Sequence, residues 1–95
     1  MRIQWAIAAI ADIDDISRYI RRQNPQAALK VRGRIVAATL SLEQFPEIGR
    51  GTMRPGYRLL VVKNLPYVVG YRVFADYIEI ASVMDGRMNR SPDIL

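Results

Sequence analysis

The sequence has no histidine and no cysteine among its 95 residues. Without cysteine there are no disulfides, thiolate metal ligands or cysteine nucleophiles, which agrees with a reducing compartment. Without histidine, serine–histidine and cysteine–histidine catalytic pairs are excluded, and zinc would need a site built from carboxylates alone. We therefore expect no metal site and no cofactor. Any chemistry would be carried by arginine, lysine, tyrosine, aspartate or glutamate.

Long apolar runs are also missing. No segment approaches the length of a membrane span, and the opening residues MRIQWAIAAIADIDD reach acidic side chains too early for a secretory signal. We therefore expect a cytoplasmic protein that does not contact a membrane. About half of the residues are apolar (51%) and about a quarter are charged (24%), the balance of a folded domain. A chain of this length buries one core, which predicts a single domain over residues 1–95.

Lysine contributes only two of the fourteen basic residues, and the formal net charge is +5. Arginine-rich surfaces favour planar, bidentate contacts with carboxylate or phosphate groups. No acidic residue lies between Asp15 and Glu43. The basic residues in this interval are Arg18, Arg21, Arg22, Lys30, Arg32 and Arg34. Three interpretations stay open: a solvated helix face, a surface for an acidic protein, and a surface for nucleic acid.

The first predicted elements are a short strand and a helix. Residues 1–5 alternate in polarity, as a half-buried strand would. From about residue 8 the period changes to three or four residues, which predicts an amphipathic helix that ends near Gln23. Three aspartates within residues 12–15 are expected in its early turns, where the helix dipole favours anions.

A second helix is predicted to follow almost without a linker. Asn24 can cap it, Pro25 suits its first position, and apolar residues continue at helical spacing to about Phe45. The segment FPEIGRG ends it, because proline and glycine do not continue a helix. Two helices joined this closely pack as an antiparallel hairpin.

The second half of the chain reads as three strands. Residues 57–63, 67–73 and 77–84 are rich in valine, isoleucine and tyrosine, and the short segments NLP and FAD separate them. This predicts a three-stranded antiparallel meander. With the N-terminal strand and the helical hairpin, it predicts an α+β fold that has both helices on one face of the sheet. The chain after Met84 is turn-rich, and about residues 88–95 are expected to be a short flexible tail.

Basic residues and tyrosines recur in the predicted meander. They are Arg54, Arg58, Lys63, Arg72 and Arg87, with Tyr57, Tyr67, Tyr71 and Tyr77. Strand parity places Arg58 and Lys63 on opposite faces, so these cations cannot all point the same way, and either can simply protect a sheet edge. We expect Tyr67 and Tyr71 to pack in the core rather than to stack on bases. The DGR segment is a turn signal that would carry Arg87 to the end of the sheet.

The order of these elements resembles the ParE/RelE superfamily of toxins from bacterial toxin–antitoxin systems. The matching segments are DIDDISRYIRRQNPQAA, FPEIGR, YRLLVVKNLPYVVGYRV and YIEIASVMDGR, and the resemblance covers about residues 5–87. In this superfamily, RelE-like members cut messenger RNA on the ribosome with a cluster of lysine, arginine and a C-terminal tyrosine, glutamate or histidine. ParE-like members lack that cluster and poison DNA gyrase.

The residues favour the ParE-like branch. Where RelE-like enzymes carry paired basic residues, YRLLV offers Arg58 and then Leu60, and Val68 replaces the arginine of the next strand. Arg87 falls at the position of a catalytic arginine, but no tyrosine or histidine follows it. Phosphodiester cleavage needs charge stabilisation and proton transfer together, so we expect no catalytic residue. Asp85 departs from the histidine that ParE-like chains often carry before Gly-Arg.

The resemblance implies a toxin that inhibits DNA gyrase and is neutralised by a ParD-like antitoxin in a hetero-oligomer. The alternative is a RelE-like, ribosome-dependent mRNA endoribonuclease, and direct binding of nucleic acid is left open. An acidic, partly disordered antitoxin segment would fold along the basic and apolar surface of the hairpin and sheet. The residues expected to contact the antitoxin are Arg18, Arg21, Arg22 and Arg32. Those expected to contact the target are Arg58, Arg72 and Arg87.

Overall fold

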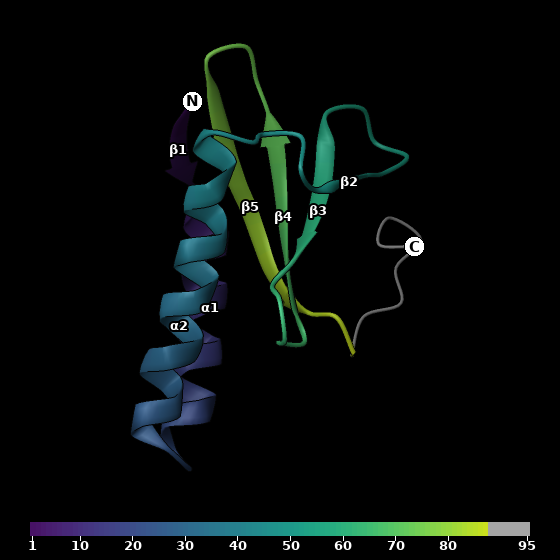
Figure 1. Ribbon diagram of the computed structural model, residues 1–95. Coiled ribbons are helices and arrows are strands. Elements are labelled where there is room, and N and C mark those ends of the chain that lie inside the picture. Colours follow the sequence, from purple (N-terminus) through teal and green to yellow (C-terminus); the bar gives the residue numbers. More distant parts are fainter. Residues whose placement is uncertain (88–95) are drawn as a thin grey trace.

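A strand, two helices and then the remaining strands make up the structure, a computed structural model that describes residues 1–87 (Figure 1). The elements are β1 (Arg2–Trp5), α1 (Ile7–Arg21), α2 (Pro25–Leu40), the 3-10 helix η1 (Ser41–Glu43), β2 (Arg50–Gly51), β3 (Tyr57–Val61), β4 (Tyr67–Val73) and β5 (Tyr77–Asp85). The predicted order of elements is confirmed, and the tail expected at about residues 88–95 lies outside the described residues. No helix within residues 1–87 is long and apolar enough to cross a membrane.

The second helix begins as predicted and ends earlier. Asn24 Oδ1 accepts a hydrogen bond from the Ala27 backbone N–H across 3.1 Å, and Pro25 occupies the first helical turn. The α-helix ends at Leu40, not near Phe45, and the chain tightens into η1. The Ser41 hydroxyl donates to the carbonyl three residues back across 2.6 Å. Such side-chain bonds compete with α-helical hydrogen bonding, which favours a 3-10 end.

The aspartates of α1 act differently from the prediction. The first turn of α1 contains no acidic residue, so the expected dipole role at the helix start is wrong. Asp12 instead accepts a hydrogen bond from the Val83 backbone N–H of β5. Asp14 binds Arg32 of α2. These acids therefore tie α1 to its neighbours in the fold.

A single five-stranded sheet orders the strands β1-β5-β4-β3-β2. β3, β4 and β5 form the predicted antiparallel meander, and β1 pairs with β5 in parallel. Nothing in the sequence predicts β2, because its two residues are too few to show a polarity pattern. The register between β4 and β5 shifts by one residue, since Gly70 faces Ser82 while Tyr71 faces Ile80.

The core lies between the two helices and one face of the sheet. α1 and α2 contribute Ala9, Ile13 and Ile35, which cluster with sheet residues that include Tyr71. Both helices therefore cover the same face, as predicted (Figure 1). Tyr67 and Tyr71 are 8% and 0% exposed, which confirms their predicted packing role. No helix of the described chain covers the opposite face, which we call the open face.

Candidate functional site

The end of the sheet that carries Arg87 forms a cleft with α1. The residues that line it are Asp15, Ile16, Tyr19, Tyr67, Asp85 and Arg87. We call this the Arg87 cleft. The DGR segment turns here as predicted, because the Gly86 backbone N–H donates to the Pro66 carbonyl across 2.7 Å. The Arg87 backbone N–H donates to Asp85 Oδ1 across 2.9 Å, and this turn sets Arg87 at the rim of the cleft.

Asp85 holds the guanidinium of Arg87 in a bidentate ion pair. Arg87 Nε donates to Oδ1 across 3.1 Å, and Nη2 donates to Oδ2 across 2.8 Å. The hydrogen bonds from Arg87 lower the pKa of Asp85, and Asp85 in turn raises the pKa of Arg87. Both groups therefore stay charged at neutral pH. The side chain of Arg87 is 70% exposed, which leaves it accessible to a partner.

Two buried tyrosines, Tyr67 near Arg87 and Tyr71 near Arg58, are poorly suited to transfer protons. Burial raises the pKa of Tyr67, and the charge of Asp85 raises it further. Burial also raises the pKa of Tyr71, although a hydrogen bond from the Gly49 backbone N–H works in the opposite direction. A phenol with a pKa above its ordinary value of about 10 stays protonated at neutral pH. Neither tyrosine is tuned to replace a terminal proton donor.

Apolar side chains occupy the two strand positions at which the resemblance to RelE-like enzymes implies positive charge. Leu60 of β3 is partly buried and packs against the core. Val68 of β4 is half-buried and lies opposite Met84 of β5. Both positions contribute packing rather than charge. Within residues 1–87, no group of three or more acidic side chains is placed to hold a metal ion.

The three cations expected to contact the target do not form one cluster. Arg58 lies opposite Tyr71 on the helix-covered face, whereas Arg72 lies opposite Tyr57 on the open face. Arg87 lies beyond the end of β5, next to the strand end where β4 begins. The structure therefore separates these three residues onto two faces and one end of the sheet.

Like Arg87, which pairs with Asp85, the other two cations already have partners within the protein. Arg58 Nη1 donates to the Gly49 carbonyl across 2.7 Å and so holds the loop that leads into β2. Arg72 Nη1 donates to Glu79 Oε1 across 3.1 Å on the neighbouring strand. Arg58 thus has a structural role in addition to any binding role.

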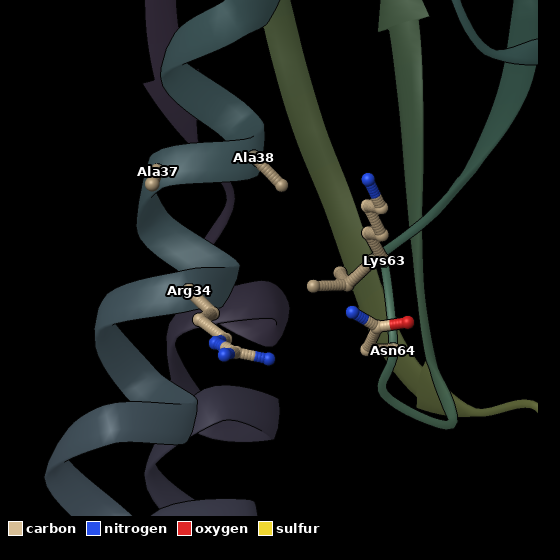
Figure 2. Close-up of a pocket in the computed structure, with 6 residues that line it drawn as sticks. Arg34, Ala37, Ala38, Lys63 and Asn64 are labelled. Atoms are coloured by element: carbon tan, nitrogen blue, oxygen red, sulfur yellow. The ribbon is translucent and has the colours of Figure 1, made fainter.

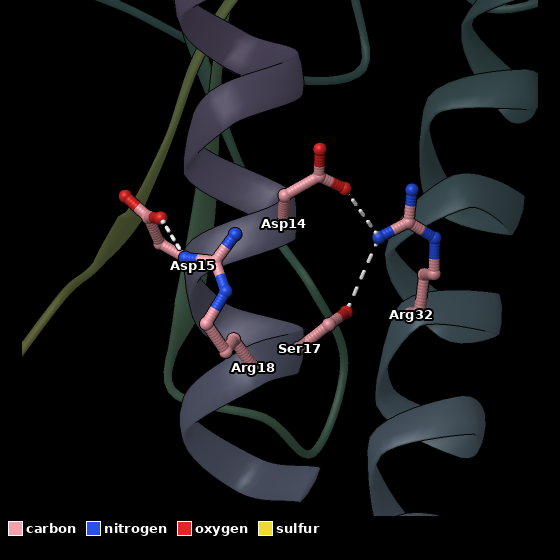
Figure 3. A network of polar contacts seen from close by, with 5 residues as sticks. All are labelled: Asp14, Asp15, Ser17, Arg18 and Arg32. Carbon is pink, nitrogen blue, oxygen red and sulfur yellow. Dashed lines mark hydrogen bonds and ion pairs between the residues drawn. The ribbon is translucent and has the colours of Figure 1, made fainter.

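The cations expected to contact the antitoxin lie on the helical hairpin, and two of them bind acids there (Figure 3). Arg32 of α2 donates to Asp14 Oδ1 across 2.9 Å and to Ser17 Oγ across 3.3 Å, which links the two helices. Arg18 donates to Asp15 Oδ1 within α1 across 2.8 Å. The other two are exposed at the end of α1: Arg21 and Arg22.

A groove separates α2 from the turn between β3 and β4 (Figure 2). It is lined by Arg34, Ala37, Ala38, Val62, Lys63 and Asn64. We call this the hairpin groove. Figure 2 shows Arg34 and Ala38 of α2 facing the turn that carries Lys63. The two charged residues in the lining are both basic, and small alanine side chains leave room beside them for the side chains of a partner.

Sequence reasoning did not predict that Arg34 and Lys63 would line the same groove. The two residues belong to a helix and to a turn that only the tertiary fold brings together. It also did not predict that the side chain of Tyr57 lies over Gly70. A signal for that contact was present, because an isolated glycine inside a strand marks a close approach.

Comparison with known proteins finds a matching family and several relatives. The family described as "ParE toxin of type II toxin-antitoxin system, parDE" matches residues 3–90. Toxin ParE3 of Caulobacter vibrioides is 35% identical over 81 residues, which span 82% of this chain and 79% of that protein. Toxin RelE2 of the same organism is 33% identical over 82 residues, which span 86% of this chain and 91% of that protein.

Two further matches cover most of the chain. Y4kP of Sinorhizobium fredii, whose name describes it as a candidate toxin, is 37% identical over 83 residues, 87% of this chain and 85% of that protein. A solved structure described as a chromosomal ParDE toxin–antitoxin system from P. aeruginosa superposes with a TM-score of 0.81 at 30% identity. That match covers 90% of this chain and 95% of the other, so the likeness extends over the helices and the sheet alike.

Proposed function

This chain belongs to the ParE toxin family of type II toxin–antitoxin systems, and we propose that it acts in the cytoplasm as an inhibitor of DNA gyrase. In this proposal the toxin binds gyrase without catalysing a reaction, holds it in its cleaved-DNA state and so stops replication. The likeness to toxin ParE3 supports this branch of the superfamily.

The observation that carries the proposal is the ion pair of Asp85 with Arg87. A ribonuclease would need Arg87 to stabilise charge on the scissile phosphate. Here the carboxylate of Asp85 already balances that guanidinium at 2.8 Å and would repel a phosphate brought to the same place. The lowered pKa of Asp85 keeps this carboxylate ionised. Arg87 is therefore better suited to protein recognition than to RNA cleavage.

The second candidate function is cleavage of messenger RNA on the ribosome. The likeness to toxin RelE2 favours it, as does the exposed position of Arg87 at the end of the sheet. In this case Arg87 would exchange Asp85 for a phosphate. Leu60 and Val68 would add no charge, so proton transfer and much of the charge stabilisation would have to come from the ribosome.

We further propose that a ParD-like antitoxin binds in the hairpin groove. An acidic amphipathic segment could place apolar side chains against Ala38 and Val62 and carboxylates near Arg34 and Lys63. The likeness to a ParDE system supports a partner of this kind. Ordering of a disordered segment would cost conformational entropy, which the burial of apolar side chains offsets.

The four arginines of the helical hairpin that are expected to contact the antitoxin differ in how accessible their guanidinium groups are. Arg21 and Arg22 are exposed at the tip of the hairpin and can meet carboxylates directly. Arg18 and Arg32 would first have to give up their intramolecular acids or share them. We therefore propose Arg21 and Arg22 as the stronger antitoxin contacts among the four.

For the target, we propose Arg87 as the principal contact, with Arg72 on a separate surface. Arg58 would act mainly by fixing the loop at Gly49, because its guanidinium is engaged there. A guanidinium that already donates to a carbonyl loses less side-chain entropy on binding but offers fewer donors to a partner.

One paired experiment tests the choice of target. Purified toxin, freed of antitoxin, is added to a gyrase supercoiling and DNA-cleavage assay and to a cell-free translation reaction. We expect inhibited supercoiling, accumulated cleaved DNA and intact message. Arrested translation with cut message, and no effect on gyrase, would overturn the gyrase proposal and support the alternative.

A further inference from the structure

The two helices carry exposed apolar side chains on the side of the hairpin that faces away from the sheet. The side chains of Ile13 and Ile35 point into the core, whereas Ile7 is 86% exposed. Leu29 and Leu40 of α2 are 73% and 52% exposed. Apolar side chains that gather in one exposed patch with a polar rim mark a site of protein contact.

These side chains form two rows that lie next to each other. Intervals of three and four residues set side chains on one face of a helix. The residues at such intervals are Ile7, Ile10 and Asp14 of α1 with Leu29, Arg32, Val36 and Leu40 of α2. We call these seven residues the outer hairpin face. Arg32 binds Asp14 between the antiparallel helices, so Ile10 comes level with Val36, and Ile7 comes level with Leu40 (Figure 3).

The second helix is apolar on two sides. Ala28 and Ile35 are buried on its inner side, while Leu29 and Leu40 are exposed on its outer side. A helix that is apolar on more than one side is typical of burial between neighbours. Gly33 weakens the helix relative to alanine, yet apart from the helix backbone itself no atom of the described chain lies within 4 Å of the place that a Cβ would take. The missing side chain therefore leaves room for another helix to approach from outside.

The charges at the centre of the outer hairpin face balance each other. Arg32 Nη1 lies 2.9 Å from Asp14 Oδ1, and both side chains are partly exposed. The hairpin groove, in contrast, carries the two positive charges of Arg34 and Lys63. An acidic segment is therefore attracted to the groove rather than to this face. A neutral, apolar face fits a partner that is also apolar and that carries one acid and one base.

We propose that the outer hairpin face binds the same face of a second copy of this chain, so that four helices form a bundle. A two-fold axis parallel to the helices sets α1 of one copy on α2 of the other and runs them antiparallel. Such an axis brings each level of one hairpin to the same level of the other. Ile10 of one copy then meets Val36 of the other, and the apolar ends of the two faces cover each other.

The same symmetry makes the central charges complementary. Asp14 of each copy comes next to Arg32 of the other, so that two acids and two bases alternate around the centre of the bundle. Arg21 and Arg22 lie at the far end of the hairpin, away from the apolar residues, where water and salt screen their repulsion. The inference goes beyond the proposed function and does not rest on it, because neither gyrase nor antitoxin takes part.

The first test measures self-association of purified toxin, freed of antitoxin, by sedimentation at rising protein concentration. We expect the mass to rise from that of one chain towards that of two. The variant Ile7→Gln/Leu40→Gln changes only exposed side chains and is expected to weaken self-association at least about tenfold. Its control is Met53→Gln/Val61→Gln, which makes the same kind of change at side chains that are 87% and 66% exposed elsewhere on the toxin. This control is expected to associate as the unmodified toxin does.

The second test exchanges the charges at the centre of the bundle. Asp14→Arg alone brings four arginines together, and Arg32→Asp alone brings four aspartates together. Each variant alone should therefore self-associate at least about tenfold more weakly. A mixture sets the arginines of one variant against the aspartates of the other, and we expect association to return. Association that appears only on mixing cannot result from misfolding, and loss of the exposed ion pair within one chain costs little stability.

The inference is overturned if the unmodified toxin stays monomeric at every concentration, or if the two glutamine double variants weaken association equally. Charge variants that are folded by circular dichroism but stay apart when mixed would overturn it as well. If Ile7→Gln/Leu40→Gln loses antitoxin binding in place of self-association, the outer hairpin face belongs to the antitoxin. A toxin that forms this dimer but spares gyrase would contradict the proposed function while supporting the dimer.

Discussion

The carboxylate of Asp12 in α1 accepts a hydrogen bond from the backbone N–H of Val83 in β5 across 2.9 Å. β1 pairs with β5 only as far as Ile80, so Val83 lies beyond the reach of that neighbouring strand. The helix thus supplies an acceptor for a sheet residue where the edge strand has ended. A partly buried N–H that found no partner there would cost free energy.

Replacement of Asp12 should destabilise the fold measurably. Asp12→Ala leaves the Val83 N–H without this acceptor, and we expect a loss of about 1–3 kcal/mol in the free energy of unfolding. Asp12→Asn keeps an amide oxygen and should lose less. Urea denaturation followed by circular dichroism measures both. The control is Asp15→Ala, because Asp15 forms an exposed ion pair with Arg18 that is worth little. Equal unfolding midpoints for Asp12→Ala and Asp15→Ala would contradict the assigned role.

Tyr71→Phe should loosen the loop between η1 and β2. The Tyr71 hydroxyl donates to the Pro46 carbonyl across 2.8 Å and accepts from the Gly49 N–H across 2.9 Å. Loss of these two hydrogen bonds, one buried and one partly buried, should cost about 1–3 kcal/mol. Hydrogen exchange should quicken first at Gly49. Tyr19→Phe is the matched control, because Tyr19 is 65% exposed. Unchanged exchange at Gly49 in the Tyr71 variant would count against this anchor.

Stability should fall in alkaline solution because Tyr67 has a raised pKa in the folded protein. The unfolded chain releases this proton at about pH 10, while the folded protein retains it to higher pH. The stabilisation is therefore complete below about pH 10 and is lost as the pH rises towards the folded value. Urea titrations from about pH 8 to about pH 11 test this. Tyr67→Phe should show a shallower decline than the unmodified toxin, and an identical decline would refute the assignment.

Substitutions at Arg87 and Asp85 should change toxicity in opposite directions. Arg87→Ala removes the proposed target contact and should reduce growth arrest at equal expression while antitoxin binding stays intact. Asp85→Asn removes the charge that balances Arg87, so the guanidinium should meet its target with full positive charge and arrest growth more strongly. Arrest that stays unchanged in Arg87→Ala, with normal protein levels, would rule out the contact.

Charge reversal in the hairpin groove should weaken the antitoxin complex. Lys63→Glu places a carboxylate where an acidic segment is proposed to lie. Loss of a charged contact of about 1.5–3 kcal/mol corresponds to roughly 10- to 150-fold in Kd. Titration calorimetry with the antitoxin measures the change. Arg2→Glu on the open face makes the same charge change away from the groove and should have little effect. An equal effect of both variants would point to net charge rather than to the groove.

Much of the fold follows from local sequence. Asn24 and Pro25 identify the start of α2 because capping and proline geometry are local effects. Tyr67 and Tyr71 are identified as core residues by their place in an apolar strand. The parallel pairing of β1 with β5 was beyond this reasoning, because it joins residues such as Ile3 and Ile78 that lie far apart along the chain.

The candidate surfaces were harder to predict than the fold. A charge run in the sequence shows which residues are basic, but not which acids the fold sets beside them. From composition alone Arg32 is expected to bind a partner. In the structure it forms an ion pair with Asp14 on the other helix of the hairpin. Arg34 carries no local signal of special position, and only the approach of the β3–β4 turn gives it Lys63 as a neighbour.

The pairing of β1 with β5 affects when the toxin can fold during its synthesis. β5, the partner strand of β1, is synthesised more than seventy residues after it. At about 5–20 residues per second, the ribosome needs several seconds to supply β5. Until β5 has been synthesised, β1 has no strand to pair with, and α1 cannot pack against β5. We expect the nascent toxin to be unfolded and harmless throughout this interval, so an antitoxin made beforehand has time to meet it as it folds.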